Sequence, residues 1–355
     1  SAPRDSVNQQ VGYWASEYFY AHQAYPQALK YGLQALPLCN NDEDRANYLS
    51  LISLIYFRQS NYEQAANYAK QCYKLDEKSG DPVVMSSSLN TLAGIYIGAN
   101  QPKEAEQYIL KAIELAKQAN NPARMAVLNG MASEVYHALG NGKEALKYIN
   151  EACNIEQELG NEHKLMVRLS QKAAVLVGLN DYKGAEKLLR QAIPYLEKVG
   201  NKQSLAISCN KMGMALVGQN RDNEAVDYYR KAADIFVTIG DRGNEMHSRK
   251  GLYESLWSSN PDSAKIELNR FNDLKDSLYN LTSAESLARY NAEFGTDWLQ
   301  HENELQKAKI QKIIIWGSIL LVLLVGGVWF FMKRKMRLRE SALQTIIKEL
   351  QPQNE

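Results

Sequence analysis

The sequence has few of the residues that most often perform chemistry. Its 355 residues include 4 cysteines and 5 histidines, and these stand far apart. No two histidines lie at the spacing of metal ligands, and there is no CxxC, HExxH, P-loop or calcium-loop pattern. Because these motifs are absent, we expect that the protein is not an enzyme, has no catalytic residue and binds no metal or cofactor.

A surplus of charge of one sign is also absent. Lysine and arginine number 41 against 40 aspartates and glutamates, which gives a formal charge of +1. Nucleic-acid binding depends on an excess of cations, so this balance argues against nucleic acid bound by this chain. With 45% apolar and 23% charged residues, the composition excludes a disordered or collagen-like chain.

One segment of the chain differs from this average charge and composition. Residues 313–332 contain no charge, and about twenty helical residues span the roughly 30 Å hydrocarbon core of a bilayer. Trp316 and Trp329 stand near the two ends of the segment, where interfacial aromatic residues are preferred. The basic residues that follow it directly are Lys333, Arg334 and Lys335. The pattern predicts a single transmembrane helix whose ends lie at these membrane-interface residues.

The basic flank also predicts the orientation of this helix. Positive residues favour the cytoplasmic side, so we expect a cytoplasmic C-terminus and an extracytoplasmic, periplasmic N-terminal region. The alternative is a cytosolic N-terminal region held by a C-terminal membrane anchor.

The sequence before the span repeats itself. Alanines recur after 37 residues and then four times after 40, at Ala28, Ala65, Ala105, Ala145, Ala185 and Ala225. A second small residue follows each by seven positions, at Ala35, Cys72, Ala112, Ala152, Ala192 and Ala232. Glycine and asparagine accept left-handed backbone at helix ends, and they recur at the expected turns. These turns are Ser60-Asn61, Gly80-Asp81, Asn100-Gln101, Asn120-Asn121, Gly140-Asn141, Gly160-Asn161, Asn180-Asp181, Gly200-Asn201, Asn220-Arg221 and Gly240-Asp241.

Two further positions complete the repeat. Twelve residues before each first alanine stands a small residue, at Ser16, Ser53, Ala93, Ser133, Ala173 and Gly213. Three residues later stands a large one, at Phe19, Tyr56, Tyr96, Tyr136, Leu176 and Leu216. From about residue 9 to about residue 241 the chain resembles the tetratricopeptide-repeat (TPR) family in this register. The resemblance implies an all-α fold, a right-handed TPR α-solenoid of helix-turn-helix repeats that serves protein–protein interaction.

We therefore expect four segments. Residues 1–276 form the TPR array, with six repeats of about 40 residues and a degenerate seventh. Residues 277–312 form a capping and juxtamembrane helix, 313–332 the transmembrane helix, and 333–355 a basic cytoplasmic tail helix. The apolar stripe of 287–308 fits either a two-chain coiled coil, and hence a homodimer, or one amphipathic helix folded onto the array. The tail is either a set of stop-transfer cations or the start of a dimeric coiled coil.

The first helix of each repeat lines the concave surface of such a solenoid. Residues on its inner face predict a groove for a peptide or protein partner, formed by Asn47, Ser50, Phe57, Arg58, Asn90, Ile97, Glu134, His137, Asn210, Lys211 and Met214. In TPR proteins the asparagine at the fifth position often binds a peptide main chain, and the resemblance gives this role to Asn90 and Asn210. The alternative is that this lining packs against the array's own C-terminal helix.

The four cysteines are expected to be buried free thiols, since Cys72 occupies a packing position of the repeat. A disulfide between Cys39 and Cys72 in an oxidising compartment is the alternative.

The layout of repeats, span and short basic helix is similar to bacterial one-span TPR sensors, in which a cytoplasmic regulatory domain follows the span. This resemblance implies signal transduction, in which binding in the groove is relayed across the membrane to a regulator. The sequence shown departs from it because no such output domain is present. The alternative is a scaffold for assembly of a membrane or envelope protein complex that transmits no signal.

The segment boundaries generate a first prediction. If the array ends before the apolar span, the fragment 1–290 is a soluble, helical monomer that needs no detergent. Circular dichroism and light scattering after gel filtration measure its helicity and mass. A fragment that stays in solution only with detergent would contradict the proposed division of the chain.

Overall fold

The protein is described here by a computed structural model, in which the chain divides into two compact units, 1–287 and 288–355. The described residues are 2–22, 24–281, 307, 310–318 and 325–344. Every regular element in these ranges is helical, which confirms the expected all-α class.

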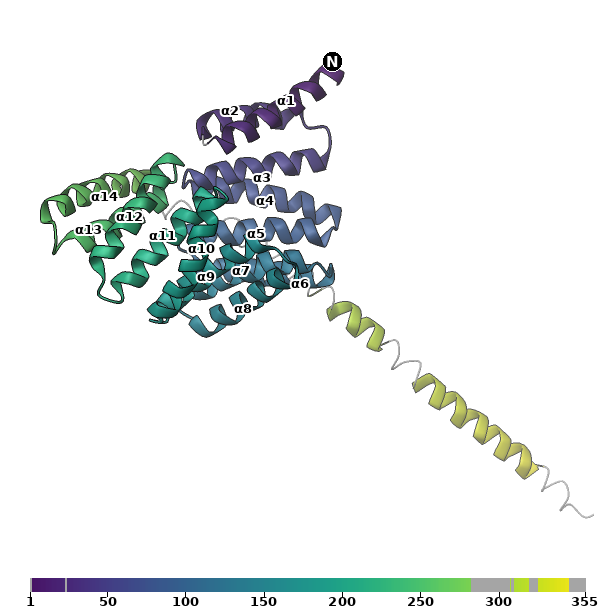
Figure 1. Ribbon diagram of the computed structural model, residues 1–355. Coiled ribbons are helices and arrows are strands. Elements are labelled where there is room, and N and C mark those ends of the chain that lie inside the picture. The colour runs from purple at the N-terminus through teal and green to yellow at the C-terminus, as the bar shows by residue number, and fades with distance from the viewer. Residues whose placement is uncertain (1, 23, 282–306, 308–309, 319–324, 345–355) are drawn as a thin grey trace, which may run out of the picture. The chain divides into compact units, whose positions relative to one another are not determined.

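The first unit is a succession of helices joined by short turns (Figure 1). Most of them are 17 residues long, and each packs against the helix before it and the helix after it. The helices are α1 (Ala2–Ala21), α2 (Tyr25–Ala35), the short 3₁₀ helix η1 (Leu36–Leu38), α3 (Asp42–Arg58), α4 (Tyr62–Ser79), α5 (Pro82–Gly98), α6 (Pro102–Gln118), α7 (Pro122–Ala138), α8 (Gly142–Glu158), α9 (Glu162–Gly178), α10 (Tyr182–Lys198), α11 (Lys202–Val217), α12 (Asp222–Thr238), α13 (Arg242–Leu256) and α14 (Pro261–Leu281).

The turns have the backbone that the sequence predicts. The first residue of each of the ten expected turn pairs has a positive φ, from 48° at Asn120 to 75° at Gly140. The second residue often caps the next helix, as where the Asn141 side chain accepts a hydrogen bond from the Glu144 amide. A residue with a left-handed backbone conformation ends one helix, and the side chain of the next residue caps the following helix. One helix therefore ends and the next begins within two residues.

The alanines of the repeat lie where consecutive helices cross. All six first alanines, from Ala28 to Ala225, are 0% exposed. The small residue on the preceding helix forms a hydrogen bond at the same crossing in two repeats. Ser16 Oγ donates to the Ala28 carbonyl at 2.9 Å, and Ser53 Oγ donates to the Ala65 carbonyl at 2.8 Å. A larger side chain would push the two helices apart, so these positions set the geometry of each repeat.

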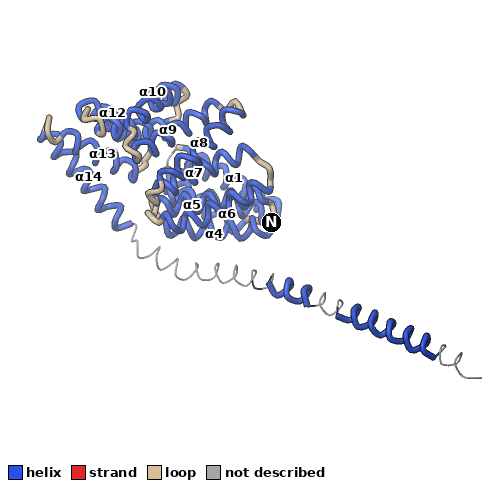
Figure 2. Tube along the Cα trace, turned by 90° about the horizontal axis from the view of Figure 1, so that it is seen from below, coloured by secondary structure: helices blue, strands red, loops and turns tan. Residues whose placement is uncertain are grey.

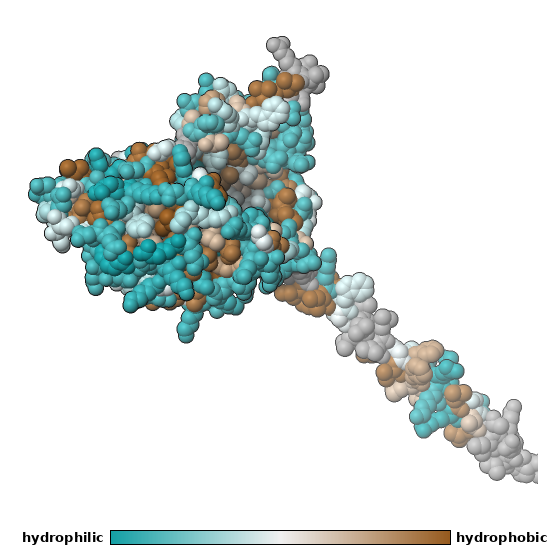
Figure 3. Space-filling view, in the orientation of Figure 1, coloured by the Kyte–Doolittle hydropathy of each residue, from teal (hydrophilic) through white to brown (hydrophobic). Residues whose placement is uncertain are grey.

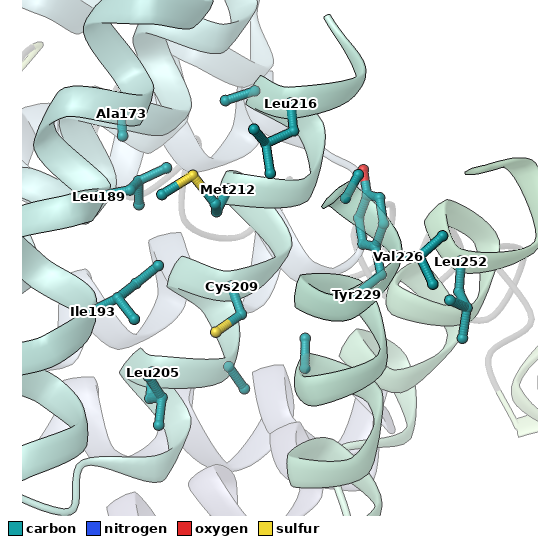
Figure 4. Packing of buried hydrophobic residues seen from close by; sticks show 14 of the residues in the cluster. Ala173, Leu189, Ile193, Leu205, Cys209, Met212, Leu216, Val226, Tyr229 and Leu252 are labelled. Atoms are coloured by element: carbon teal, nitrogen blue, oxygen red, sulfur yellow. The ribbon is translucent and has the colours of Figure 1, made fainter. Parts of the chain in front are cut away.

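The largest apolar cluster joins α9 to α14 through the interior of the array. Figure 4 shows Leu189 and Ile193 pointing from α10 toward Cys209 and Met212 of α11. Each repeat therefore buries its apolar residues against the next repeat, as expected for a solenoid.

The stack of helices is curved, as Figures 1 and 2 show. The curvature brings the turn after α12 back to the first repeat, where the Tyr25 hydroxyl donates to the Ile239 carbonyl at 3.4 Å. These two residues are 214 positions apart in sequence. The array therefore closes on itself after about six repeats.

The last helix pair forms the degenerate seventh repeat. Ala264 is 0% exposed, like the first alanines of the other repeats. Among the described helices, α14 packs against α13 alone. Most of the C-terminal helix that could cover the inner face lies outside the described residues, so that alternative stays open.

All four cysteines are buried and free. The Cys72 thiol lies 3.3 Å from the Ala46 carbonyl and 3.4 Å from Ser88 Oγ. Burial raises the pKa of Cys72 to about 12, so the thiol is protonated and unreactive at neutral pH. The expectation of buried free thiols is confirmed.

In the second unit, residues 310–318 and 325–344 are helical. In the part of the chain that the structure describes, no helix combines the length and the apolar character needed to cross a bilayer. Residues 319–324, in the middle of the predicted span, lie outside the described residues, as do most of the predicted juxtamembrane helix and the end of the tail.

An ion-pair network joins the fifth and sixth repeats. The Glu186 carboxylate on α10 accepts hydrogen bonds from Arg190 at 2.6 Å, Arg221 at 2.8 Å and Gln219 at 2.9 Å, and its side chain is 12% exposed. Burial alone would raise the pKa of Glu186, but these three donors outweigh burial and lower it to about 2. The carboxylate therefore binds its partners only in its ionised form.

This network predicts loss of stability in acid. A glutamate in the unfolded chain has a pKa of about 4.3, so the stabilisation is complete above that pH and is lost as the pH falls toward about 2. Urea midpoints measured from pH 6 to pH 2 should fall less steeply in Glu186→Gln than in the wild type. The matched control is Glu158→Gln on the exposed surface of α8, which should keep the wild-type slope. An unchanged slope in Glu186→Gln would contradict the role of the network.

Candidate inner-face binding site

The residues predicted to form the groove lie on α3, α5, α7 and α11. Asn47 and Met214 are exposed, the latter by 43%, whereas Asn210 is 8% exposed. The other eight are partly buried: Ser50, Phe57, Arg58, Asn90, Ile97, Glu134, His137 and Lys211. The surface in Figure 3 is mainly hydrophilic, with apolar side chains in scattered patches.

Polar side chains connect α7, α8 and α9 across the inner side of the array. The Gln171 amide donates to Glu134 Oε1 at 2.6 Å, and Gln171 Oε1 accepts from the Arg168 guanidinium at 2.8 Å. Arg168 in turn lies 3.7 Å from the Glu156 carboxylate, and these two side chains are 10% and 0% exposed. A buried pair of this kind fixes the position of both partners, because breaking it would leave a charge without compensation.

His137 and Lys211 lie beside this network. Burial lowers the pKa of Lys211, partly opposed by the Glu134 carboxylate. Burial, followed by the charge of Lys211, lowers the pKa of His137. The His137 ring packs onto Gly178, where a Cβ atom would collide with it. Lys211 makes no hydrogen bond or ion pair with any described residue, so its ammonium group is available to a ligand.

The two fifth-position asparagines each have an unsatisfied group. The side-chain carbonyl oxygens of Asn90 and Asn210 are buried and have no hydrogen-bond partner among the described residues. A buried acceptor without a donor is costly, commonly by about 1–3 kcal/mol. Ordered water and the N–H groups of a bound chain are both donors of the kind that these oxygens can accept from.

Phe57 and Arg58 do not join the residues around Lys211. The Phe57 and Tyr62 rings pack over Gly98, the latter 2.7 Å from where a Cβ atom would stand. The Arg58 guanidinium donates to the Tyr20 hydroxyl at 3.3 Å. The predicted groove thus divides into a set around Glu134, His137 and Lys211 and a second set near the closure of the array.

The sequence pattern missed Glu156, which anchors the network. Its register position is apolar in Ala116, Leu196 and Phe236, all 0% exposed. The same position is charged in Asp76, which is 9% exposed. A carboxylate at a mostly apolar repeat position is the signal that identifies Glu156, because such a group is buried only with a partner.

Two clefts lie away from the predicted site. One of about 600 Å³ is lined by Glu197, Leu205 and Lys231, and one of about 490 Å³ by Met125, Asn129 and Glu151. Neither is lined by a predicted groove residue. No cluster of three potential metal ligands occurs within the described residues.

The predicted membrane-interface residues lie on the helices of the second unit. Trp316 is 70% exposed and Trp329 59%. The Lys333 ammonium stands 4.6 Å from the centre of the Trp329 ring. Arg334 and Lys335 are also exposed. The aromatic and basic side chains at this end of the predicted span are thus in contact, as is common at membrane interfaces.

The proximity of Lys211 to His137 generates a prediction. Replacing the cation by an apolar residue removes one of the two causes that lower the pKa of His137, so this pKa should rise in Lys211→Met. An NMR pH titration, with the signal assigned by its absence in His137→Gln, measures the shift. Lys202→Met, at the exposed start of the same helix, should leave the titration unchanged. The same His137 pKa in the wild type, Lys211→Met and Lys202→Met would contradict the proximity of Lys211 to His137.

Two sequence families match parts of this chain. The cohesin loading factor family matches residues 24–143, and a tetratricopeptide repeat family matches residues 205–238. None of the curated proteins matches the sequence.

Several solved structures share the fold. A Rap protein in complex with competence and sporulation factor matches with a TM-score of 0.65 and 16% identity, over 78% of this chain and 77% of that one. The Rap conjugation gene regulator of the plasmid pLS20 in complex with the Phr* peptide matches with 0.64 and 14%, over 78% and 76%. Aspartyl phosphate phosphatase F from Bacillus subtilis matches with 0.62 and 12%, over 77% and 72%. The described residues from 2 to 281 therefore form a solenoid of tetratricopeptide-type helical repeats, as the register of the sequence predicts.

Proposed function

We propose that this protein is a membrane-anchored, non-enzymatic TPR protein that binds a peptide or protein segment on its inner face. The observation that carries the proposal is the pair of buried asparagine carbonyls, Asn90 and Asn210, which lack a donor within the described residues. The main-chain N–H groups of an extended peptide are donors of the required kind.

The charges on the inner face add to this argument. Lys211 offers an ammonium group without a bonded carboxylate, close to Glu134 and His137. A ligand acceptor, such as a main-chain carbonyl or a carboxylate, would satisfy it in a poorly solvated place, where such a bond is stronger than in water. The Asn90 and Asn210 carbonyl oxygens can accept hydrogen bonds, and the Lys211 ammonium group can donate them. An extended peptide offers partners for both, because its main chain carries N–H and C=O groups.

The solved relatives supply a parallel. Two of them are Rap proteins whose structures contain a bound factor or peptide, competence and sporulation factor in one and the Phr* peptide in the other. Their identities of 16% and 14% support a common fold. Peptide binding by this chain remains a proposal that rests on its own inner-face residues.

The proposal extends across the membrane. The uncharged segment 313–332 anchors the protein, the array lies on the extracytoplasmic side, and the basic tail lies in the cytoplasm. Binding on the inner face is relayed through the span to a regulatory partner, with the chain acting as a homodimer.

A scaffold for a membrane or envelope complex that transmits no signal is the second candidate, and a helical-repeat array that presents a protein-binding face would suit it equally well. Crosslinking in membranes followed by purification separates the two. A stoichiometric set of envelope proteins supports the scaffold, whereas a kinase or DNA-binding protein supports the relay.

Replacing the two asparagines should have opposite effects on the stability of the free protein and on its capture of peptides. Asn90→Ala and Asn210→Ala remove buried acceptors that have no donor, so the free protein should become equally or more stable. Capture of peptides from a phage-displayed random library should instead weaken by about tenfold for each variant, because the ligand loses a hydrogen bond of about 1.4 kcal/mol.

The matched control is Asn223→Ala, an exposed asparagine of α12, which should change neither quantity. Unweakened capture in Asn90→Ala and Asn210→Ala would contradict a role for these residues in binding. Capture of no peptide by the wild type would contradict the proposed function itself.

A further inference from the structure

We propose that contacts between the first two repeats and the turn that follows the last full repeat form a clasp that closes the array and controls entry to its inner face. The clasp consists of Tyr25, Arg58 and Ser60 on one side and the turn 239–243 on the other. The control of entry rests on the proposed function, whereas the clasp itself does not.

The two sides touch at three points. The Tyr25 hydroxyl donates to the Ile239 carbonyl at 3.4 Å. A Cβ atom on Gly240 would stand 3.5 Å from the Tyr25 ring, and one on Gly243 would stand 3.6 Å from Ser60 Oγ. These are ordinary van der Waals distances, so the surfaces are in contact without strain.

Opposite charges face each other at the same place. The pKa of Arg58 is raised even though burial acts to lower it, because the Tyr20 hydroxyl and the Asp241 carboxylate favour the charged guanidinium. Asp241 is held in position, since it accepts hydrogen bonds from the Asn244 amide at 3.1 Å and from the Gln203 side chain at 2.8 Å. The attraction acts beyond 4 Å, because the structure contains no ion pair between Arg58 and Asp241.

These contacts are weak compared with the other junctions of the array. Neighbouring repeats share buried apolar clusters and helix-on-helix packing, whereas the clasp consists of one long hydrogen bond, two edge contacts and one unbonded charge attraction. The clasp is therefore the junction that opens first. Its opening separates the first two repeats from the turn that follows the last full repeat and widens access to the inner face between them.

The turn on the C-terminal side is suited to this role. Position 243 carries a side chain in the preceding repeats, where Val83, Ala123, His163 and Gln203 occupy it, and glycine only in this one. A Cβ atom at position 243 would still be in ordinary van der Waals contact with Ser60, so a small side chain fits here as well.

Cysteine crosslinking of the full chain tests the closure. In Ser60→Cys/Gly243→Cys a Cβ atom at position 243 would stand 3.6 Å from the γ-atom position of residue 60, which brings the two thiols within reach of each other. The matched control pair is Asn100→Cys/Gly243→Cys, because Asn100 occupies the same turn position one repeat later, with the same φ of 58°.

Mild oxidation should close the first pair at least about tenfold faster than the control pair. The product is a faster-migrating monomer on a non-reducing gel. It should be absent from the two variants that carry only Ser60→Cys or only Gly243→Cys. Equal rates for the two pairs would overturn the clasp.

Charge reversal tests the attraction. Arg58→Glu places a carboxylate beside Asp241 and should slow closure of the Ser60→Cys/Gly243→Cys pair severalfold. The control is Arg45→Glu, a reversal at an exposed position of the same helix, which should leave the rate unchanged. Equal slowing by both reversals would show that general charge, and not Arg58, controls closure.

A disulfide that locks the clasp tests whether the clasp controls entry to the inner face. The oxidised Ser60→Cys/Gly243→Cys protein should capture at least about tenfold fewer clones from a phage-displayed random peptide library than its reduced form. Reductant should restore capture. Equal capture by the locked and reduced proteins would overturn the control of entry while leaving the clasp intact. If wild-type protein captures no peptide, the proposed function fails, and the crosslinking rates still decide the clasp by themselves.

Discussion

Two helices can cross closely only where one of them presents a side chain no larger than a methyl group, and the array depends on this contact. Six alanines, one in each repeat, occupy these crossings with no exposed surface. Neighbouring large residues pack around them, as Leu189 and Met212 do in the cluster between α9 and α14. Because helix-on-helix packing joins only repeats that follow one another, the small rotation fixed at each crossing adds up along the chain. The curvature of the array, and with it the inner face, is the sum of these local contacts.

This close packing leaves little room for polar groups, so those that are buried carry specific roles. The pair Arg168–Glu156 and the chain from Arg168 through Gln171 to Glu134 use most of their hydrogen-bonding capacity within the array. They hold α7, α8 and α9 in one arrangement. Arg168 Nε and Glu156 Oε1 have no hydrogen-bond partner in the described structure, and neither have the side-chain carbonyl oxygens of Asn90 and Asn210. The array is thus rigid beside positions that remain open to a ligand.

Features set by local chemistry could be predicted from the sequence. A positive φ at Ser60 or Gly140 depends on the residue and its immediate neighbours, and the burial of Ala145 depends on a periodicity visible in the sequence. The residues of the predicted groove lie on the first helices of their repeats but differ in exposure, since Asn210 is almost fully buried. The repeat pattern says which face a residue occupies, whereas its exposure depends on how tightly the adjacent first helices pack.

Contacts between distant repeats could not be predicted in the same way. Arg58 was assigned to the groove by its position in the repeat, and its register gives no sign of Tyr25 or Asp241. Their meeting depends on the rotations accumulated over several repeats, and a small change in each rotation would separate them by many ångströms. The transmembrane helix remains a prediction from the sequence, because residues 319–324 lie outside the described part of the chain.

The position of the closure bears on how binding could reach the membrane side. Asp241 is the N-cap of α13, since its carboxylate accepts from the Asn244 amide. Within the described array α14 packs on α13 and on no other helix, and α14 leads toward the predicted span. A movement of the turn 239–243 would therefore act on α13 and α14, and it would also reach α9 to α12, because one apolar cluster joins all of these helices. The relay in the proposed function would have to run through this shared core and not through one helix pair alone.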